Sequence, residues 1–134
     1  MLVRDIMTHE VTALAPSVSI ADVAAIMRQL EIGSLPVMHQ GSLVGIITDR
    51  DIVVRVVAEG LDPHMETVDF HMTRNPIVAA PDWTIEQAAQ LMLSRQFRRL
   101  PVVDQGQLVG YLALRDLATH PAVQPSADTP TADL

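Results

Sequence analysis

The residues with the clearest chemical potential in this 134-residue chain form a short polar turn at positions 48–51, between two apolar stretches. The β-branched residues before the turn predict a buried strand, and the valines and isoleucine after it recur at helical spacing. Thr48 and Asp51 stand three residues apart, which is the spacing of a reciprocal helix capping box. Backbone amide groups at such a turn can also bind a phosphate. The turn therefore predicts a helix cap, an anion site, or both.

Arginine supplies the whole positive charge of the chain, since all nine basic residues are arginine. The planar guanidinium matches phosphate oxygens well, although a genomic bias in codon use is the better explanation for most of the nine. Four arginines are set apart by their positions in or near the predicted turns: Arg50, Arg98, Arg99 and Arg115. The net charge of −7 argues against a nucleic-acid partner, which would need a concentrated basic face. A small anion is the better candidate ligand.

The polar turn returns 65 residues later (110 minus 45, from the glycine that precedes each copy). Without a gap, residues 3–52 and 68–117 share 18 identities in 50 aligned positions. In the second copy Arg115 and Asp116 are retained, whereas Ala113 takes the position of Thr48. Such an internal repeat indicates an architecture of two similar units.

Each repeat is predicted to run strand, helix, strand, strand, helix. In the first copy these elements are expected at 11–14, from the start signal Pro16-Ser17 and Ser19 to Gly33, at 35–38, at 43–47 and at 49–58, with a tight turn at Gln40-Gly41. Thr84 is expected to cap the corresponding helix of the second copy. The predicted domains are repeat 1 at 1–60, a linker at 61–67 and repeat 2 at 68–119. Residues 120–134, rich in proline and small polar residues, are expected to be a disordered tail.

Composition and spacing argue against several classes of function. No cysteine is present, the five histidines lack paired metal-ligand spacing, and no nucleophile elbow or placed acid pair is found. We therefore expect no metal site and no enzymatic activity. No apolar run approaches a membrane span and the first residues lack the apolar stretch of a signal peptide, which predicts a cytoplasmic protein without membrane contact.

Three motifs, each present twice in one register, resemble the tandem cystathionine β-synthase (CBS) domain pair, or Bateman module. They are Met-Thr at 7–8 and 72–73, Leu-Pro-Val at 35–37 and 100–102, and Gly-x-x-[Ser/Thr]-x-x-Asp from Gly45, with the serine or threonine replaced in the copy from Gly110. The resemblance implies an α/β fold of two β-α-β-β-α repeats packed with pseudo-twofold symmetry. It also implies clefts between the repeats that bind AMP, ADP, ATP or S-adenosylmethionine, and association of two modules into a homodimer.

The resemblance assigns roles to particular residues. Asp51 and Asp116 would contact ribose hydroxyls, and Thr48 would contact ribose or phosphate. Arg98 and Arg99 would reach ligand phosphates, as basic residues before the Leu-Pro-Val strand do in the gamma subunit of AMP-activated kinase. The remaining candidates are the basic residues of the two turns, Arg50 and Arg115, and four residues for the adenine ring, Val11, Thr12, Ile77 and Val78.

The resulting expectation is a regulatory module that senses an adenine nucleotide or adenosine derivative and signals to a partner protein, whose identity the sequence does not give. The alternative is a structural module for dimerisation or partner docking that has no physiological nucleotide. Helix capping alone would explain the Thr48 and Asp51 spacing under that alternative. Apolar residues such as Val53 and Val57 on the outer side of a helix favour a homodimer under either hypothesis.

Overall fold

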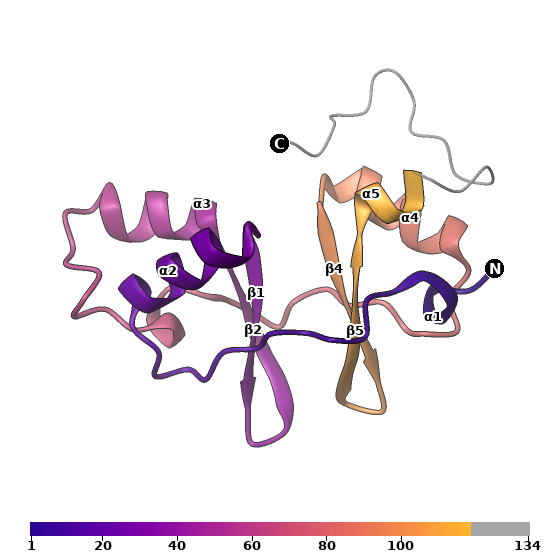
Figure 1. Ribbon diagram of the computed structural model, residues 1–134, viewed down its shortest axis with the longest axis horizontal. Helices are drawn as coiled ribbons and strands as arrows, with labels where there is room; N and C mark the ends of the chain where they lie inside the picture. Colours follow the sequence, from indigo (N-terminus) through magenta and orange to yellow (C-terminus); the bar gives the residue numbers. More distant parts are fainter. Residues whose placement is uncertain (119–134) are drawn as a thin grey trace. The chain divides into compact units, whose positions relative to one another are not determined.

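The computed structural model describes residues 1–118, which form two compact units (Figure 1). The first unit combines Met1–Val11 with residues 77–118, and the second unit is Thr12–Pro76. These units divide the chain differently from the sequence repeats, because the opening segment of each repeat folds with the body of the other repeat. The predicted repeat boundaries at residues 60 and 68 therefore describe the sequence pattern and not the compact units.

The second unit contains three helical stretches, a 3-10 turn and a small three-stranded sheet. The sheet is antiparallel in the order β1-β2-β3. Its elements in chain order are α2 (Ile20–Leu30), β1 (Ser34–His39), β2 (Ser42–Thr48), α3 (Asp49–Ile52), the π-helical η1 (Val53–Val57), the 3-10 turn η2 (Val68–Phe70) and β3 (Thr73–Arg74).

Helix α2 begins where the sequence predicted it but ends by a different residue. The Asp22 amide donates a hydrogen bond to the Ser19 side chain (3.1 Å), which caps the helix. The helix closes at Glu31, whose backbone is left-handed (φ 56°). The prediction that Gly33 ends the helix was therefore wrong: a glycine favours the left-handed conformation but is not required for it.

The β1–β2 hairpin turns at Gln40 and Gly41, as predicted, and both have positive φ angles (51° and 80°). This pair of angles is typical of the tight turn that suits the twist of two antiparallel strands. The predicted strand at 11–14 is reduced to one isolated bridge, in which Leu14 lies parallel to Val37. The β-α-β-β-α order is thus present with a minimal first strand.

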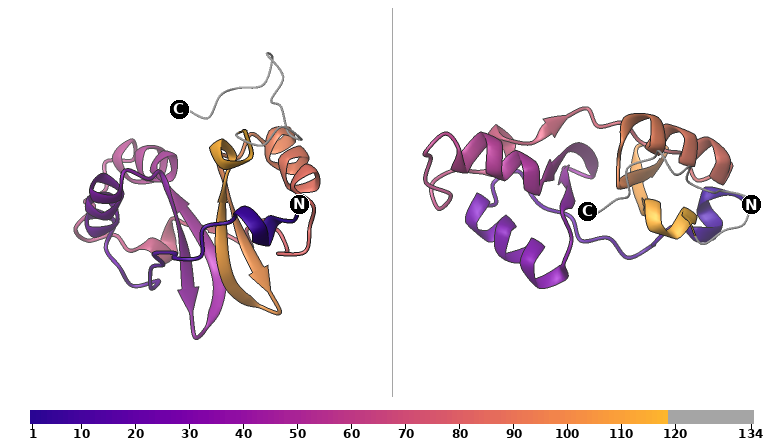
Figure 2. Two further views of the ribbon diagram at one scale, coloured as in Figure 1. Left: turned by 45° about the vertical axis from the view of Figure 1, so that its right-hand side comes forward. Right: turned by 90° about the horizontal axis from the view of Figure 1, so that it is seen from above.

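The first unit repeats this plan around the two-stranded sheet β4-β5. Figure 2 shows α4 along one side of this hairpin. The Thr84 side chain caps α4, and Ala79 makes the isolated bridge parallel to Val102 that corresponds to the one at Leu14. The elements are α1 (Val3–Ile6), α4 (Ile85–Arg95), β4 (Arg99–Asp104), β5 (Gln107–Ala113) and α5 (Leu114–Ala118).

Each Met-Thr motif packs against the glycine of the third motif in the other repeat. A Cβ atom added to Gly45 would lie 2.6 Å from Met72 Sδ and 2.8 Å from the Thr73 carbonyl oxygen. In the other unit, a Cβ on Gly110 would lie 2.7 Å from the sulfur of the equivalent methionine, Met7. Both glycines are needed because another chain segment crosses directly over them.

Each unit has its own aliphatic core. Each core includes residues from the opening segment of the other repeat, which is called the exchanged segment below. Val3 is fully buried among side chains of α4, β4 and β5, whereas Val68 and Met72 are buried among those of α2, β1 and β2. The helix methionines Met27 and Met92 are core residues as well. Among residues 1–118, no helix is both long and apolar enough to cross a membrane.

Candidate functional site

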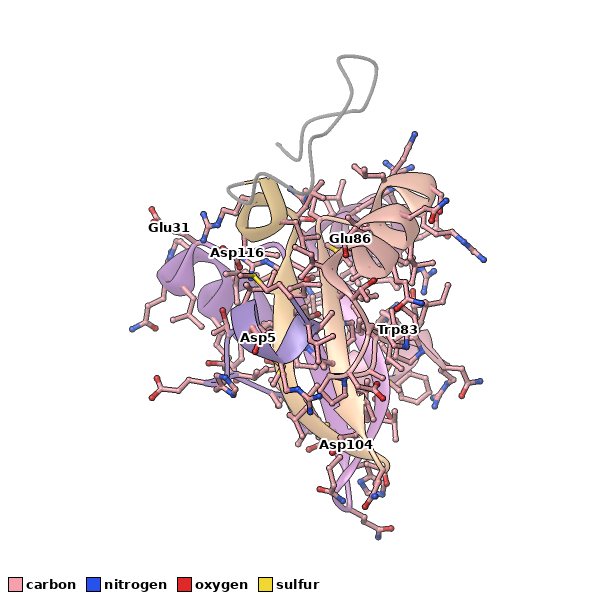
Figure 3. All side chains as sticks on the ribbon, turned by 90° about the vertical axis from the view of Figure 1, so that its right-hand side faces the viewer. Asp5, Glu31, Trp83, Glu86, Asp104 and Asp116 are labelled. Carbon is pink, nitrogen blue, oxygen red and sulfur yellow. The ribbon has the colours of Figure 1, made fainter. Side chains whose placement is uncertain are left out.

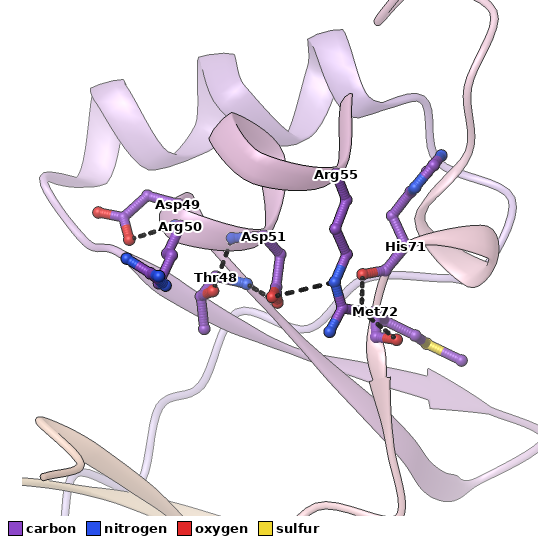
Figure 4. A network of polar contacts seen from close by, with 7 residues as sticks. All are labelled: Thr48, Asp49, Arg50, Asp51, Arg55, His71 and Met72. Carbon is purple, nitrogen blue, oxygen red and sulfur yellow. Dashed lines mark hydrogen bonds and ion pairs between the residues drawn. The ribbon is translucent and has the colours of Figure 1, made fainter. Parts of the chain in front are cut away.

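The turn that follows β2 is a complete reciprocal capping box (Figure 4). The Asp51 amide donates to Thr48 Oγ1 (3.1 Å), and the Thr48 amide donates to Asp51 Oδ2 (3.0 Å). The capping interpretation of this spacing is therefore confirmed. Both side chains can still make further hydrogen bonds, because a carboxylate has about four lone-pair sites and a hydroxyl that accepts still has a proton to donate.

Asp49 and Arg50 occupy the outer side of the same turn. Both are exposed, and the Arg50 amide donates to Asp49 Oδ1 (2.8 Å). The Asp51 side chain is only 12% exposed. The turn thus brings together the three predicted residues Thr48, Arg50 and Asp51, with a hydroxyl, a guanidinium and a carboxylate within four positions.

Arg55 lies one helical turn beyond Asp51 and places a positive charge beside the Asp51 carboxylate. Its Nε is 3.7 Å from Asp51 Oδ1, and its Nη1 donates to the carbonyl oxygens of His71 (2.9 Å) and Met72 (3.4 Å). The turn that carries Arg55 is wound as a π-helix, with the Ala58 amide donating to the Val53 carbonyl (2.8 Å). π-Helical turns are rare in proteins overall, but those that occur are often found at functional sites.

The corresponding end of the other unit carries three arginines around the start of α5. Arg99 pairs with Ala113 across the β4–β5 ladder, and the Leu114 amide donates to the Arg98 carbonyl (2.8 Å). Arg115 and Asp116 follow in α5, where Figure 3 labels Asp116. The structure therefore brings Arg98, Arg99, Arg115 and Asp116 to one end of this unit, and their role in ligand binding stays a prediction.

This arrangement disfavours positive charge at Arg99. Partial burial lowers the pKa of its guanidinium, and the positive charges of Arg115 and Arg98 lower that pKa further, while Tyr111 and Asp116 act in the opposite direction. Arginine remains protonated at neutral pH even so. A nearby anionic group stabilises the charged form of Arg99, as Asp116 does.

The four residues predicted to face an adenine ring do not form one group within either unit. Val11 ends one segment of the first unit and Thr12 begins the second unit, so the unit boundary falls between them. Thr12 is exposed and Val11 is half-buried. Ile77 packs against the core of the first unit, beside the half-buried Val78. Their predicted role in ligand binding stays a prediction.

Within residues 1–118, no group of three or more histidine, cysteine or acidic side chains could hold a metal ion. His71 is buried, and its Nε2 lies 2.7 Å from Glu66 Oε1. Arg55 and this pair were missed by the sequence reasoning. The i,i+4 spacing of an acid and an arginine, Asp51 and Arg55, was the available signal for an ion pair.

Two small α/β units, each with a β-hairpin that leads into a short helix, define a tandem α/β module as the class of protein. The family model of the CBS domain matches residues 3–58 and 67–122. The chain therefore belongs to the CBS domain family, as the resemblance predicted, and it has the family's α/β fold in two tandem copies.

Relatives and solved structures agree with this assignment. The CBS domain-containing protein YhcV of Bacillus subtilis is 41% identical over 125 residues, which are 93% of this chain and 89% of the relative. Hypoxic response protein 1 of Mycobacterium tuberculosis is 35% identical over 118 residues, 87% of this chain and 82% of the relative. A crystal structure of Hypoxic Response Protein I with two coordinated zinc ions has a TM-score of 0.81 and 33% identity, covering 90% of this chain and 98% of that one.

A further solved structure bears on the ligand. The crystal structure of CBSX2, a CBS-pair protein of Arabidopsis thaliana, in complex with AMP has a TM-score of 0.77 and 30% identity. The match covers 87% of this chain and 92% of that chain. The relatives thus include one CBS pair that holds an adenine nucleotide and another that holds zinc.

Proposed function

We propose that this chain is a regulatory module that binds an adenine nucleotide or adenosine derivative, with AMP, ADP, ATP and S-adenosylmethionine as the candidates. The AMP complex of CBSX2 is the observation that carries the proposal. Asp51 accepts hydrogen bonds from the ribose hydroxyls, and Thr48 donates its remaining proton to ribose or phosphate. Asp116 has the same role in the second repeat, and Arg50, Arg98, Arg99 and Arg115 supply positive charge for the phosphates.

Chemistry of the described residues supports a nucleotide over zinc. The chain contains no cysteine, and residues 1–118 gather no group of three metal-binding side chains. By contrast, a carboxylate beside a hydroxyl and a separate arginine cluster match the donors and acceptors of a nucleotide. The module has no proposed reaction to catalyse, and its output is a change in binding to a partner protein.

The second candidate function is a structural module for dimerisation or partner docking. The exposed valines of η1 favour it, since Val53 and Val57 are 57% and 61% exposed. Under this hypothesis the capping box is the whole role of Thr48 and Asp51. The two functions are compatible in one protein, but only the first requires a ligand at the turn.

A thermal-shift screen followed by titration calorimetry tests the proposal. A ligand at 100 times its dissociation constant stabilises the protein by about 2.7 kcal/mol. Asp51→Ala is expected to weaken binding about ten- to a hundredfold through the loss of charge-assisted hydrogen bonds of about 1.5–3 kcal/mol. Asp51→Asn keeps an acceptor for the cap and is expected to weaken binding similarly with a smaller loss of melting temperature.

Asp49→Asn is the matched control, because it makes the same charge change on the exposed side of the same turn. The affinity of Asp49→Asn for the nucleotide should stay near the wild-type value. Unchanged affinity in both Asp51 variants, with only a lower melting temperature in Asp51→Ala, would reduce Asp51 to a capping residue. Absence of a shift with all four ligands would favour the structural function.

A further inference from the structure

Arg55 connects the proposed ligand-binding turn to a separate segment of the chain, residues 66–74 (Figure 4). One guanidinium faces Asp51 Oδ1 at 3.7 Å and also donates to the backbone carbonyls of His71 and Met72. A planar guanidinium can hold several acceptors in fixed directions at once, which a single point charge cannot do. The carboxylate and the two carbonyls are therefore positioned by the same group.

Residues 66–74, whose backbone Arg55 contacts, also make side-chain contacts within this unit. The buried His71 ring contacts Glu66, and the Met72 side chain lies over Gly45 of β2. Directly afterwards β3 pairs with β2, with Thr73 opposite Ile46. The segment leads straight to Pro76, the last residue of this unit. Its backbone is thus the route by which the chain leaves the unit that carries Asp51.

The equivalent positions outside the unit Thr12–Pro76 do not reproduce this arrangement. With the 65-residue offset, Arg55 corresponds to His120, His71 to Ile6 and Glu66 to Met1. Both units keep the methionine over the glycine, but the arginine and the His–Glu pair belong to the unit Thr12–Pro76. The connection between the turn and the exchanged segment is therefore specific to Asp51.

We propose that Arg55 is a positioning residue that couples ligand contact at Asp51 to the backbone of residues 71–74, so that a bound nucleotide tightens the hold on the segment leading out of this unit. The inference rests on the proposed nucleotide function. A ribose that engages Asp51 restrains its carboxylate, the carboxylate restrains the guanidinium, and the guanidinium restrains the two carbonyls. Coupling of this kind is measurable as a change in local order.

Hydrogen exchange of the unliganded protein tests the connection first. Arg55→Ala and Asp51→Asn are each expected to speed amide exchange in residues 71–74 about three- to tenfold, a modest effect because Arg55 is 47% exposed. The double variant should exchange no faster than Arg55→Ala alone, since both changes break one connection. Arg28→Ala, an exposed arginine at the end of α2, is the control and should leave this segment unchanged.

The same variants with AMP test the coupling. Saturating AMP is expected to slow exchange in residues 71–74 of the wild type, and to leave it unchanged in Arg55→Ala at an AMP concentration that saturates the variant. Arg55→Ala should weaken AMP binding about three- to tenfold in the wild-type background and not at all in the Asp51→Asn background. A merely structural role would lower affinity equally in both backgrounds.

The outcomes separate this inference from the proposed function. AMP binding by the wild type with equal slowing of exchange in the wild type and Arg55→Ala overturns the coupling and leaves the nucleotide function standing. No binding of any candidate ligand overturns the nucleotide function and the ligand-dependent part of the inference together. The unliganded exchange still decides the connection itself, which is refuted if Arg55→Ala and Arg28→Ala behave alike.

Discussion

Replacing Gly45 by alanine tests the packing that holds the exchanged segment on β2. The added Cβ would lie 2.6 Å from Met72 Sδ and 2.8 Å from the Thr73 carbonyl oxygen. An ordinary contact needs 3.4 Å or more, so the sulfur must retreat by about 0.8 Å. The side chain can give way, but the carbonyl belongs to the backbone that pairs with β2 and cannot move without lifting β3.

The expected cost follows from that difference between the two contacts. Overpacking in well-packed interiors costs about 1–3 kcal/mol, and a backbone clash places Gly45→Ala in the upper part of that range, at about 2–3 kcal/mol. At roughly 4 °C for each kcal/mol in a protein of this size, the melting temperature should fall by about 8–12 °C. Urea denaturation followed by circular dichroism measures the same loss at constant temperature.

Met72→Ala supplies the control for the Gly45→Ala experiment. It removes the sulfur contact and leaves the carbonyl contact, so the double variant should be less destabilised than the sum of the two single variants by about 0.5–1 kcal/mol or more. Gly60 has a positive φ (71°) and open space around it, so Gly60→Ala pays only backbone strain and should add to Met72→Ala without coupling. A change of less than about 0.5 kcal/mol in Gly45→Ala, or strict additivity with Met72→Ala, would refute the reasoning.

Three further predictions concern assembly and the two ligand turns. The protein should be a homodimer by light scattering at micromolar concentration, and Val53→Glu with Val57→Glu should shift it to monomer, because both valines are exposed; a monomeric wild type contradicts this. Arg99→Ala should weaken AMP by about tenfold and adenosine hardly at all in titration calorimetry, since it removes a charge-assisted contact to phosphate; equal losses would exclude a phosphate role. Asp51→Ala should remove the tighter of two binding events, and Asp116→Ala should remove the weaker one. The two dissociation constants should differ by about threefold to tenfold because the second turn lacks the hydroxyl. The reverse order would show that the assignment is wrong.

Local rules predicted the elements that depend on neighbouring residues. Ser19 and Thr84 cap the two long helices, Gln40 and Gly41 close the first hairpin, and Thr48 forms its capping box with Asp51. Each of these interactions joins residues at most three positions apart, so residue type and spacing are sufficient to predict it. The exact end of α2 was not predictable in this way, because Glu31 adopts a left-handed conformation that its residue type does not favour.

The exchange of opening segments could not be read from the repeat. An internal alignment shows that Met7 and Met72 are equivalent, but it does not show which of two equivalent glycines each methionine covers. The structure pairs Met72 with Gly45 and Met7 with Gly110, so each motif packs on the other repeat's strand. Arg55 was missed for a related reason, since its hydrogen bonds go to backbone carbonyls, which carry no sequence signal.

Because the two units share one backbone plan, each repeat serves as an internal control for the other. The methionine over a glycine is identical in both, which is what packing requires wherever a chain crosses a strand at close range. The turns differ where packing makes no such demand: a hydroxyl and a carboxylate with Arg55 nearby in one, and Arg98 and Arg99 at the positions of a glycine and a serine in the other. Under the proposed nucleotide function, the residues that differ between the two turns predict that the turns bind the ligand with different affinities.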